Sequence, residues 1–281
     1  MPPREGTLTL NGLRLHYLDW GGDGPAIVLH HATSLHAWVW EPIARRLSAR
    51  GRVLAYDARG HGDSERSPVG YGWDLLARDL AAFIEALGLA PAMVVGHSSG
   101  GTAALACAAQ LPDLVARVVA LEPVLLPPQM EGPGEGARPA WLEAVRRRRS
   151  RWPSLEEALR HLRRREAYAR WREDVLRLYL EKGTHRRPDG GVELKLPGEE
   201  EAKVYEGRSA LNIWPLLPGV GCPVLLLYGE RPNPGLEAGI REAARRLPRA
   251  RVERVPGGSH FFPQELPEET AALIESFLDE G

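Results

Sequence analysis

The residue in this sequence that is best placed to take part in a reaction is a serine that lies between two glycines. Ser98 lies in Gly96-His97-Ser98-Ser99-Gly100, between the apolar run 93–95 and the helix-forming, alanine-rich run 102–111. Glycines two positions either side of a serine allow a tight, strained strand-to-helix turn that exposes the hydroxyl. The helix N-terminus favours a developing negative charge nearby. The pattern predicts a nucleophilic serine; a glycine-rich turn before a core helix is the alternative.

A serine hydroxyl is a weak nucleophile, so this chemistry also needs a base. The sequence contains nine histidines. His97 stands beside Ser98, but its side chain should diverge from that of the serine. His61 lies in a glycine-rich turn, where a structural role is expected. His30 and His31 end an apolar run, where packing or substrate contact is expected.

The composition limits the class of protein. The chain has 281 residues, 43% of them hydrophobic, which is enough for one large or two small domains. A net charge of −1 does not suggest a nucleic-acid or anionic membrane partner. Cys107 and Cys222 lie in apolar contexts and are expected to be reduced core residues. Because no apolar leader or run of about 18 apolar residues occurs, we expect a cytoplasmic protein.

Arginine is strongly favoured over the other polar side chains. The sequence has 33 Arg, 3 Lys, 3 Asn and 3 Gln. Few amides and abundant Arg and Glu suit a thermophilic protein with surface ion-pair networks. A GC-rich genome would produce part of the same bias.

Apolar strands alternate with amphipathic helices through the first half of the chain. Two alternating runs, 7–10 and 13–18, flank Asn11-Gly12 and predict a β-hairpin. This order predicts a parallel sheet with helices on both faces. The predicted strands are 26–30, 52–56, 93–95 and 117–121, and the predicted helices are 41–50, 72–87 and 102–111.

The alternation is interrupted between the strand ending at residue 121 and a strand beginning at residue 223. Residues 127–140 are rich in Pro, Gly and Glu and predict a loop, whereas residues 139–182 are helical in pattern with two basic runs. The remaining predicted elements are an extended piece at 192–196, helices at 198–206, 235–247 and 267–278, and strands at 223–228 and 251–255.

Together these features resemble the α/β-hydrolase superfamily over essentially the whole chain. The matching motifs are the turn after the third strand, Asp-x-Arg-Gly-His-Gly-x-Ser at 57–64, the serine turn at 96–100 and Gly-Gly-Ser-His at 257–260. The resemblance implies an α/β-hydrolase fold, with a mostly parallel eight-stranded sheet, helices on both faces and a helical cap inserted after strand six. We expect a core domain of residues 1–124 and 216–281, and a cap, or lid, of residues 125–215.

The resemblance also implies a triad in the order serine, acid, histidine. His260 lies between the last strand and the last helix, where the superfamily places its base. Most members carry the acid after strand seven as Gly-x-x-Asp, but here that place has Gly229-Glu230-Arg231-Pro232. Glu122 ends strand six, as the acid does in haloalkane dehalogenases and zearalenone lactonases. We take Glu122 as the first choice and Glu230 as the second; a capping or ion-pair role for Glu122 is the alternative.

The superfamily stabilises the oxyanion with two backbone N–H groups, which here correspond to those of Ser99 and Thr33. His31-Ala32 stands where the family usually has His-Gly. Alanine in place of glycine leaves the path of this loop in doubt. The Thr33 hydroxyl could also contribute to the anion site.

The cap is expected to decide the substrate. Residues 138–182 carry 14 Lys or Arg against 7 Asp or Glu, a local charge of about +7, which suits either acidic substrates or an ordinary solvated helix face. His31, His97, Trp141 and Trp214 are expected to contact the substrate. The expected partner is a small-molecule ester or lactone, with no nucleic acid or membrane, and the protein is expected to be a monomer or homodimer.

The resemblance thus favours hydrolysis of a carboxylic ester or lactone through an acyl-enzyme on Ser98, with no metal and no organic cofactor. Carbon–carbon bond hydrolysis and perhydrolysis use the same residues in related proteins and stay open. Dehalogenation and epoxide opening need a nucleophilic aspartate, against which Ser98 argues. A catalytically silent ligand receptor is the alternative from another class, because the fold alone does not fix the function.

Overall fold

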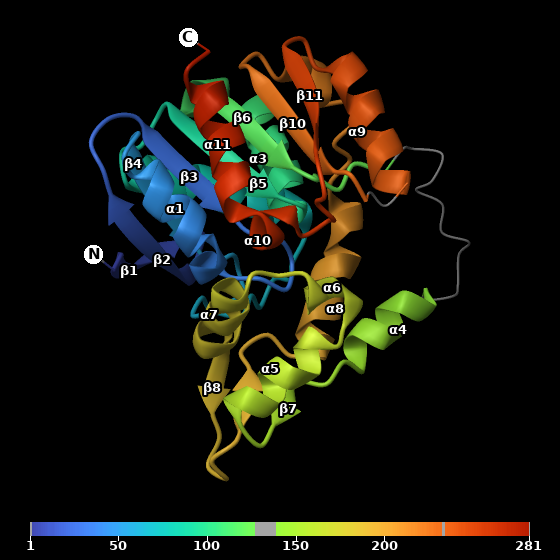
Figure 1. The fold of residues 1–281 in the computed structure, drawn as a ribbon. Helices are drawn as coiled ribbons and strands as arrows, with labels where there is room; N and C mark the ends of the chain where they lie inside the picture. Colours follow the sequence, from blue (N-terminus) through green and yellow to red (C-terminus); the bar gives the residue numbers. More distant parts are fainter. Residues whose placement is uncertain (1, 127–138, 232–233, 281) are drawn as a thin grey trace.

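An eight-stranded sheet runs through the centre of the protein in the computed structural model, which describes residues 2–126, 139–231 and 234–280 (Figure 1). The strand order is β1-β2-β4-β3-β5-β6-β10-β11. Strand β2 is antiparallel to both of its neighbours, and the strands from β4 to β11 are parallel. The bounds are β1 (Arg4–Leu10), β2 (Leu13–Gly21), β3 (Ala26–His30), β4 (Arg52–Tyr56), β5 (Ala92–His97), β6 (Val115–Leu121), β10 (Val224–Gly229) and β11 (Ala250–Val255).

The first two strands form the predicted hairpin. Leu10 pairs with Leu13 across the turn, and Asn11 and Gly12 adopt φ values of 51° and 76°. Two successive residues with positive φ match the right-handed twist of the flanking strands, which is why an Asn-Gly pair suits this turn.

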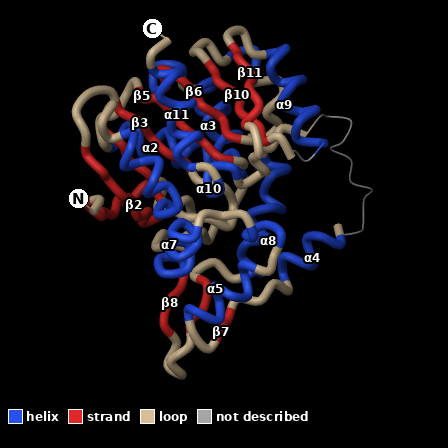
Figure 2. Tube along the Cα trace, viewed as in Figure 1, coloured by secondary structure: helices blue, strands red, loops and turns tan. Residues whose placement is uncertain are grey.

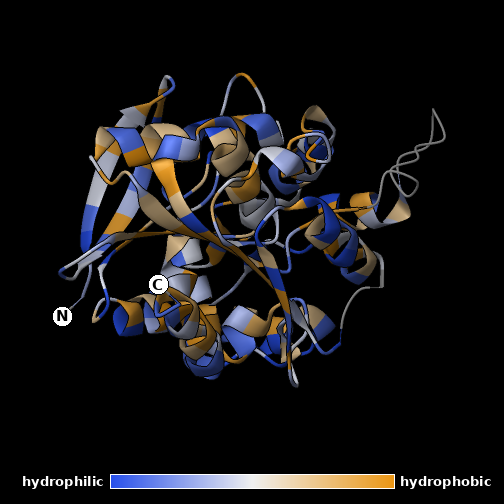
Figure 3. Ribbon diagram, turned by 90° about the horizontal axis from the view of Figure 1, so that it is seen from above, coloured by the Kyte–Doolittle hydropathy of each residue, from blue (hydrophilic) through white to orange (hydrophobic). Residues whose placement is uncertain are grey.

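Helices cover both faces of the sheet (Figure 2). Viewed from above, the hydrophobic colours concentrate in the strands between the two helical layers (Figure 3). Two separate clusters of buried apolar side chains correspond to the two faces. One face carries α2 (Trp73–Ala86), α3 (Ser99–Gln110) and α9 (Pro234–Arg246); the other carries α1 (Glu41–Leu47) and α11 (Pro267–Leu278), with the short α10 (Phe262–Glu265) before it.

The central strands are buried along their length, which explains their nearly continuous apolar sequences. Every residue of β5 and β10 is buried, as are four of the five residues in β3. Fully burying one Val or Leu side chain contributes about 1.5–3 kcal/mol, so these strands are the main source of core stability.

The chain leaves the sheet after β6 and returns at β10, and residues 139–206 of the intervening segment lie below the sheet in the view of Figure 1. We call residues 139–215 of this segment the cap. Its helices are α4 (Ala140–Arg146), α5 (Leu155–Arg163), α6 (Glu166–Ala169), α7 (Glu173–Gly183) and α8 (Gly198–Glu206).

The cap also contains a small antiparallel sheet that the sequence analysis missed. Its strands are β7 (Arg151–Trp152), β8 (Thr184–Arg186) and β9 (Val192–Leu194), in the order β7-β9-β8. Strands of two or three residues are too short to show an alternating pattern. Only the extended piece at 192–196 was predicted, and its partners were assigned to helix and turn.

The other predicted elements agree with the structure to within a few residues at their ends. Helix α8 and helix α11 have the predicted bounds. Most of the predicted loop at 127–140 lies outside the described residues. Cys107 and Cys222 are free thiols, as expected. Among the described helices, none combines the length and apolarity that a bilayer crossing demands.

A buried ion pair joins the turn after β4 to helix α2. The Arg59 guanidinium donates to both carboxylate oxygens of Asp79, from Nε at 2.7 Å and from Nη2 at 2.8 Å. Each residue is only 1% exposed. Asn11 also donates to Asp79, from Nδ2 at 2.9 Å, so the pair ties the first hairpin to the same helix.

Removing the charge of Asp79 should destabilise the protein strongly, because it leaves the Arg59 charge buried and unpaired. We expect Asp79→Asn to lower the free energy of unfolding by about 3–5 kcal/mol in urea titration. Arg78→Gln, on the same helix, removes an exposed pair with Asp74 and should cost less than about 1 kcal/mol. Equal losses from the two variants would contradict this assignment.

Candidate active site

The loops that follow β3 and β5 meet at the point where the order of the parallel strands changes direction. From β3 the chain continues outward to β4, whereas β5 lies on the opposite side of β3 and leads to β6. In open parallel sheets a crevice forms at such a point, beyond the carboxyl ends of the strands. Ser98 follows β5, the segment 31–34 follows β3, and Glu122 follows β6.

Ser98 forms the strained turn that its flanking glycines predict. Its φ is 54° and its ψ is −116°, and helix α3 begins at the next residue. The Ser98 N–H donates to the Leu121 carbonyl at 2.9 Å, which fixes the turn against the end of β6. A non-glycine residue in this conformation is costly and is held only where its surroundings determine it.

Gly96 and Gly100 are required by close backbone contacts. A Cβ atom on Gly96 would lie 2.3 Å from the Gly100 carbonyl oxygen. A Cβ on Gly100 would lie 2.4 Å from the His30 carbonyl oxygen and 2.7 Å from that of His31. The turn therefore packs directly against the end of β3, with no room for a side chain at either glycine.

His260 lies beside this turn. His97, the residue before the serine, donates from Nε2 to the His260 carbonyl oxygen at 2.8 Å, and the two imidazole centroids are 5.2 Å apart. We call residues 256–261 the histidine loop. Glu265 holds the loop from below by accepting from the Ser259 N–H at 3.0 Å and from its hydroxyl at 2.6 Å.

Glu122 is fully buried beside the histidine loop. Its Oε2 accepts from the Gly229 N–H at 3.0 Å, and a Cβ on Gly229 would lie 2.7 Å from the carbonyl oxygens of both Gly258 and Ser259. Within the described part of the chain, neither Oε1 of Glu122 nor Nδ1 of His260 has a hydrogen-bond partner. Two buried polar atoms are thus left without a partner, one on Glu122 and one in the histidine loop, and both segments contact Gly229.

Burial shifts these two groups in opposite directions. It raises the pKa of Glu122 to about 7, against the opposing effect of the hydrogen bond from Gly229. It lowers the pKa of His260 to about 4. In both residues the neutral form is favoured relative to the same group in water.

The backbone of Glu122 is also strained, with a φ of 45°. Glu230 differs from Glu122 both in burial and in backbone conformation. Its side chain is 42% exposed, its Oε2 accepts from the Gly257 N–H at 2.8 Å, and its Oε1 lies 3.5 Å from Arg254. Glu230 therefore braces the histidine loop from the solvent side, whereas Glu122 approaches it from the interior.

The segment 31–34, which we call the oxyanion loop, is tied to the serine turn. The Thr33 N–H and the Thr33 hydroxyl both donate to Oγ of Ser99, at 2.9 Å and 3.0 Å. The side chain of Ser99 thus already accepts the N–H that was expected to face an oxyanion. An anion would use the Thr33 N–H by sharing it with this hydroxyl or by displacing the hydroxyl.

His61, for which the sequence suggested a structural role, supports the next residue of this loop. Its Nδ1 donates to the Arg59 carbonyl oxygen at 3.0 Å, so its Nε2 carries the lone pair and accepts from the Ser34 N–H at 3.3 Å. Burial lowers the pKa of His61 to about 4, which keeps this acceptor neutral.

The residues expected to contact substrate are found in different settings. His31 is 1% exposed; its Nδ1 donates to Ala32 and its Nε2 accepts from Ala58, so both ring nitrogens hold the backbone. Trp214 is a core residue, 3% exposed, in the apolar cluster on the α2 and α3 face, and its Nε1–H donates to the Leu126 carbonyl. The Trp214 ring therefore belongs to that core cluster, and its contact with substrate stays a prediction. Trp141 is 54% exposed on α4, with its ring edge-to-face with Tyr205.

An aromatic cluster lies over the histidine loop. Phe261 contacts the rings of His97, Tyr168, Trp171 and His260, with centroids 5.0–6.4 Å apart. Tyr168 lies within α6 and Trp171 just after it, so the cap packs directly on the loop that carries His260.

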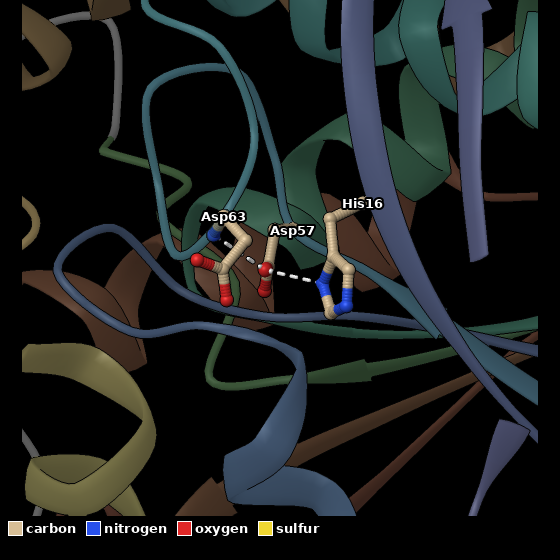
Figure 4. Close-up of side chains that lie close together, drawn as sticks. All are labelled: His16, Asp57 and Asp63. Atoms are coloured by element: carbon tan, nitrogen blue, oxygen red, sulfur yellow. Dashed lines mark hydrogen bonds and ion pairs between the residues drawn. The ribbon is translucent and has the colours of Figure 1, made fainter. Parts of the chain in front are cut away.

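Among the residues that the structure describes, one group of side chains has the composition of a metal site, namely His16, Asp57 and Asp63 (Figure 4). Asp57 accepts from His16 Nδ1 at 2.8 Å and from the backbone N–H groups of Asp63 and Ala37 at 2.9 Å and 2.7 Å. Lys195 of the cap donates to both oxygens of Asp63 at 2.7 Å. These bonds give the group a bracing role in the turn at 57–64.

The comparisons with known proteins agree with this architecture. The chain matches the model of the Alpha/beta hydrolase family over residues 27–273, and it belongs to that family. It is 31% identical to 2-(acetamidomethylene)succinate hydrolase of Mesorhizobium japonicum, over 92% of this chain and 89% of that protein. It is 29% identical to N-formylmaleamate deformylase of Pseudomonas putida, over 98% of this chain and 96% of that protein.

Solved structures give the same result. The crystal structure of E-2-(acetamidomethylene)succinate hydrolase superposes with a TM-score of 0.83 at 27% identity, covering 99% of both chains. An enol-lactonase from Burkholderia xenovorans gives a TM-score of 0.72 at 27% identity, covering 98% of this chain and all of that one. The fold and the relatives define the chain as an α/β hydrolase.

Proposed function

We propose that this α/β hydrolase cleaves a carboxylic ester or lactone through an acyl-enzyme on Ser98. The observation that carries the proposal is the strained backbone of Ser98, at the N-terminus of α3, with the histidine loop bonded to the adjacent residue. In the first step, Oγ of Ser98 attacks the acyl carbon while His260 takes its proton. The tetrahedral oxyanion faces the Ser99 N–H, the Thr33 N–H and the positive end of α3.

The intermediate then collapses, and His260 returns the proton to the departing alkoxide. A water molecule attacks the acyl-enzyme with His260 again as the base, which releases the acid and restores the Ser98 hydroxyl. In this proposal Oε1 of Glu122 accepts from Nδ1–H of His260 and stabilises the imidazolium that forms. The two unpartnered atoms and the strained backbone of Glu122 support this choice over Glu230.

A second candidate is hydrolysis of a small N-acyl substrate. The two full-length relatives are named for 2-(acetamidomethylene)succinate and N-formylmaleamate, which both contain an acylated nitrogen beside carboxylate groups. The same nucleophile and base serve an amide bond, because His260 can protonate a leaving nitrogen. Carbon–carbon bond hydrolysis and perhydrolysis require no further side chain and are tested in the same substrate panel. Parallel assays with p-nitrophenyl acetate, an enol lactone and an N-formyl enamide separate these reactions.

Ser98→Ala should abolish both turnover and covalent labelling. We expect a fluorophosphonate to add one phosphonyl group to the wild-type protein at Ser98, detected by peptide mass spectrometry, and to leave Ser98→Ala unlabelled. Hydrolysis of p-nitrophenyl acetate should fall to the background rate. A wild-type protein that is inert to the probe and to all three substrates would favour the ligand-receptor reading instead.

Glu122→Gln should lower kcat far more than Glu230→Gln does. The first substitution removes the charge that orients His260 and stabilises its protonated form, for which a loss of about 10²–10⁴-fold is reasonable. The second removes an exposed brace and should change kcat by less than about tenfold. Steady-state kinetics and thermal unfolding of both variants give the comparison, and equal or reversed losses would assign the acid elsewhere.

The proposed roles also predict a pH dependence. His260 must be neutral and Glu122 ionised, and the pKa of Glu122 is raised to about 7 whereas that of His260 is lowered to about 4. We therefore expect kcat/KM to fall about tenfold per unit as the pH drops below about 7, with the midpoint belonging to the coupled pair. Glu122→Gln should lose this limb. A wild-type profile that stays flat down to pH 5 would contradict the assignment.

A further inference from the structure

Ser34 is held in an unusual conformation by the core and by the cap. It follows Thr33 directly and has a φ of 76°, in the left-handed region. Its N–H donates to His61, and its hydroxyl donates to Oε1 of Glu201, which stands on helix α8 of the cap. A serine backbone in this region persists only where several contacts determine it.

We propose that Glu201 is a positioning residue that fixes the oxyanion loop from the cap, so that the cap controls the reactivity of Ser98 as well as the shape of the pocket. The inference rests on the proposed function, because it requires the Thr33 N–H to face the oxyanion. Glu201 acts through Ser34 and touches neither Ser98 nor His260 in the contacts that support it.

The carboxylate of Glu201 is well suited to this task. The residue is 4% exposed, and its two oxygens have separate partners. Oε1 accepts from the Ser34 hydroxyl, and Oε2 lies 2.5 Å from Nε of Arg148. Arg148 in turn donates from Nη2 to the Leu196 carbonyl oxygen at 3.1 Å. A carboxylate held at both oxygens cannot rotate away from Ser34 without leaving the Arg148 charge unpaired.

Helix α8 itself is anchored on the core by bonds that do not involve the oxyanion loop. Tyr71 donates from its hydroxyl to Oε2 of Glu200 at 2.8 Å, and Nε1 of Trp73 donates to the Val204 carbonyl oxygen at 2.9 Å. Glu201 therefore lies on a helix whose position on the core is fixed by other bonds. These two bonds also offer a control that loosens cap docking and leaves the Ser34 bond intact.

The effect on chemistry follows from chain connectivity. The Thr33 N–H lies in the peptide unit that precedes the one shared by Thr33 and Ser34. Relaxation of Ser34 out of the left-handed region rotates the shared unit and can shift the Thr33 N–H through the Thr33 Cα. An oxyanion donor works best when its loop is fixed before the charge develops. The Thr33 N–H donates to Oγ of Ser99 here, so its loop must stay in place while the anion shares this N–H or displaces that hydroxyl. Losing the Glu201 bond should therefore lower the rate of the chemical step and leave initial substrate binding nearly unchanged.

The test compares Ser34→Ala, Glu201→Leu, Glu201→Gln, Tyr71→Phe and the double variant Ser34→Ala/Glu201→Leu in the full-length protein. For each, we would measure the rate of Ser98 labelling by a fluorophosphonate, kcat and KM for p-nitrophenyl acetate, and the melting temperature. Labelling requires no knowledge of the natural substrate, and it passes through a charged phosphonyl transition state at the same donors.

We expect Ser34→Ala and Glu201→Leu to lower kcat and the labelling rate about 10–100-fold with KM within about threefold of wild type. Glu201→Gln keeps an acceptor oxygen for Ser34 and should retain most of the activity. The rate of the double variant should be within about twofold of that of the slower single variant, because loss of the Ser34–Glu201 bond is common to both changes. Tyr71→Phe should keep the wild-type labelling rate.

If Glu201→Leu does not fold, Ser34→Ala alone still tests the inference, because this variant keeps the Arg148–Glu201 pair. The inference is overturned if the folded variants are labelled at the wild-type rate, if only KM changes, or if the losses multiply in the double variant. Failure of the wild-type protein to be labelled at all would instead reject the proposed function, so the two failures are distinguishable.

Discussion

Backbone strain at the carboxyl ends of the central strands is the constraint on which the site depends. Four non-glycine residues with positive φ occur in the described chain, namely Asn11, Ser34, Ser98 and Glu122. Asn11 belongs to a hairpin turn, whereas the other three follow β3, β5 and β6 in turn. Each such residue costs of order 1–3 kcal/mol and must be held by its surroundings. The rigid parallel sheet provides that support. The strained residues thus mark positions where a fixed geometry is maintained at a cost in stability.

The cap also supplies part of the support that holds these residues in place. It bonds to both loops that flank Ser98. On one side Arg170 donates to the Gly257 carbonyl oxygen at 2.6 Å, and the Arg172 N–H donates to that of Gln264 at 3.0 Å, which fastens the histidine loop and α10. On the other side Glu201 reaches the oxyanion loop. The cap therefore contacts the segments on both sides of the serine turn, and these bonds help to hold it on the core.

Those parts of the fold and site that rest on local pattern could be predicted from sequence. The serine turn follows from glycine spacing, and the strands follow from apolar runs, because both depend on neighbours in the chain. The parts that could not be predicted depend on contacts between distant segments. Trp214 packs in the core on the α2 and α3 face, and an aromatic residue carries no sequence mark of which face it buries. The bond from Thr33 to the Ser99 side chain joins residues 66 positions apart, and that from Ser34 to Glu201 joins residues 167 positions apart. Neither of these two hydrogen bonds produces a periodic pattern in the sequence.

The electrostatics of the site explain why two unpartnered buried groups would be retained together. Burial favours the neutral forms of both Glu122 and His260, so neither is stabilised as an ion before reaction. In the proposed mechanism His260 takes the proton of Ser98, so a positive charge appears at the imidazole inside a region of low dielectric. A carboxylate at Nδ1 stabilises that charge most strongly at this moment and much less while the imidazole is neutral. The stabilisation is thus concentrated in the transition state, which is the condition for an interaction to raise kcat and not merely to tighten binding.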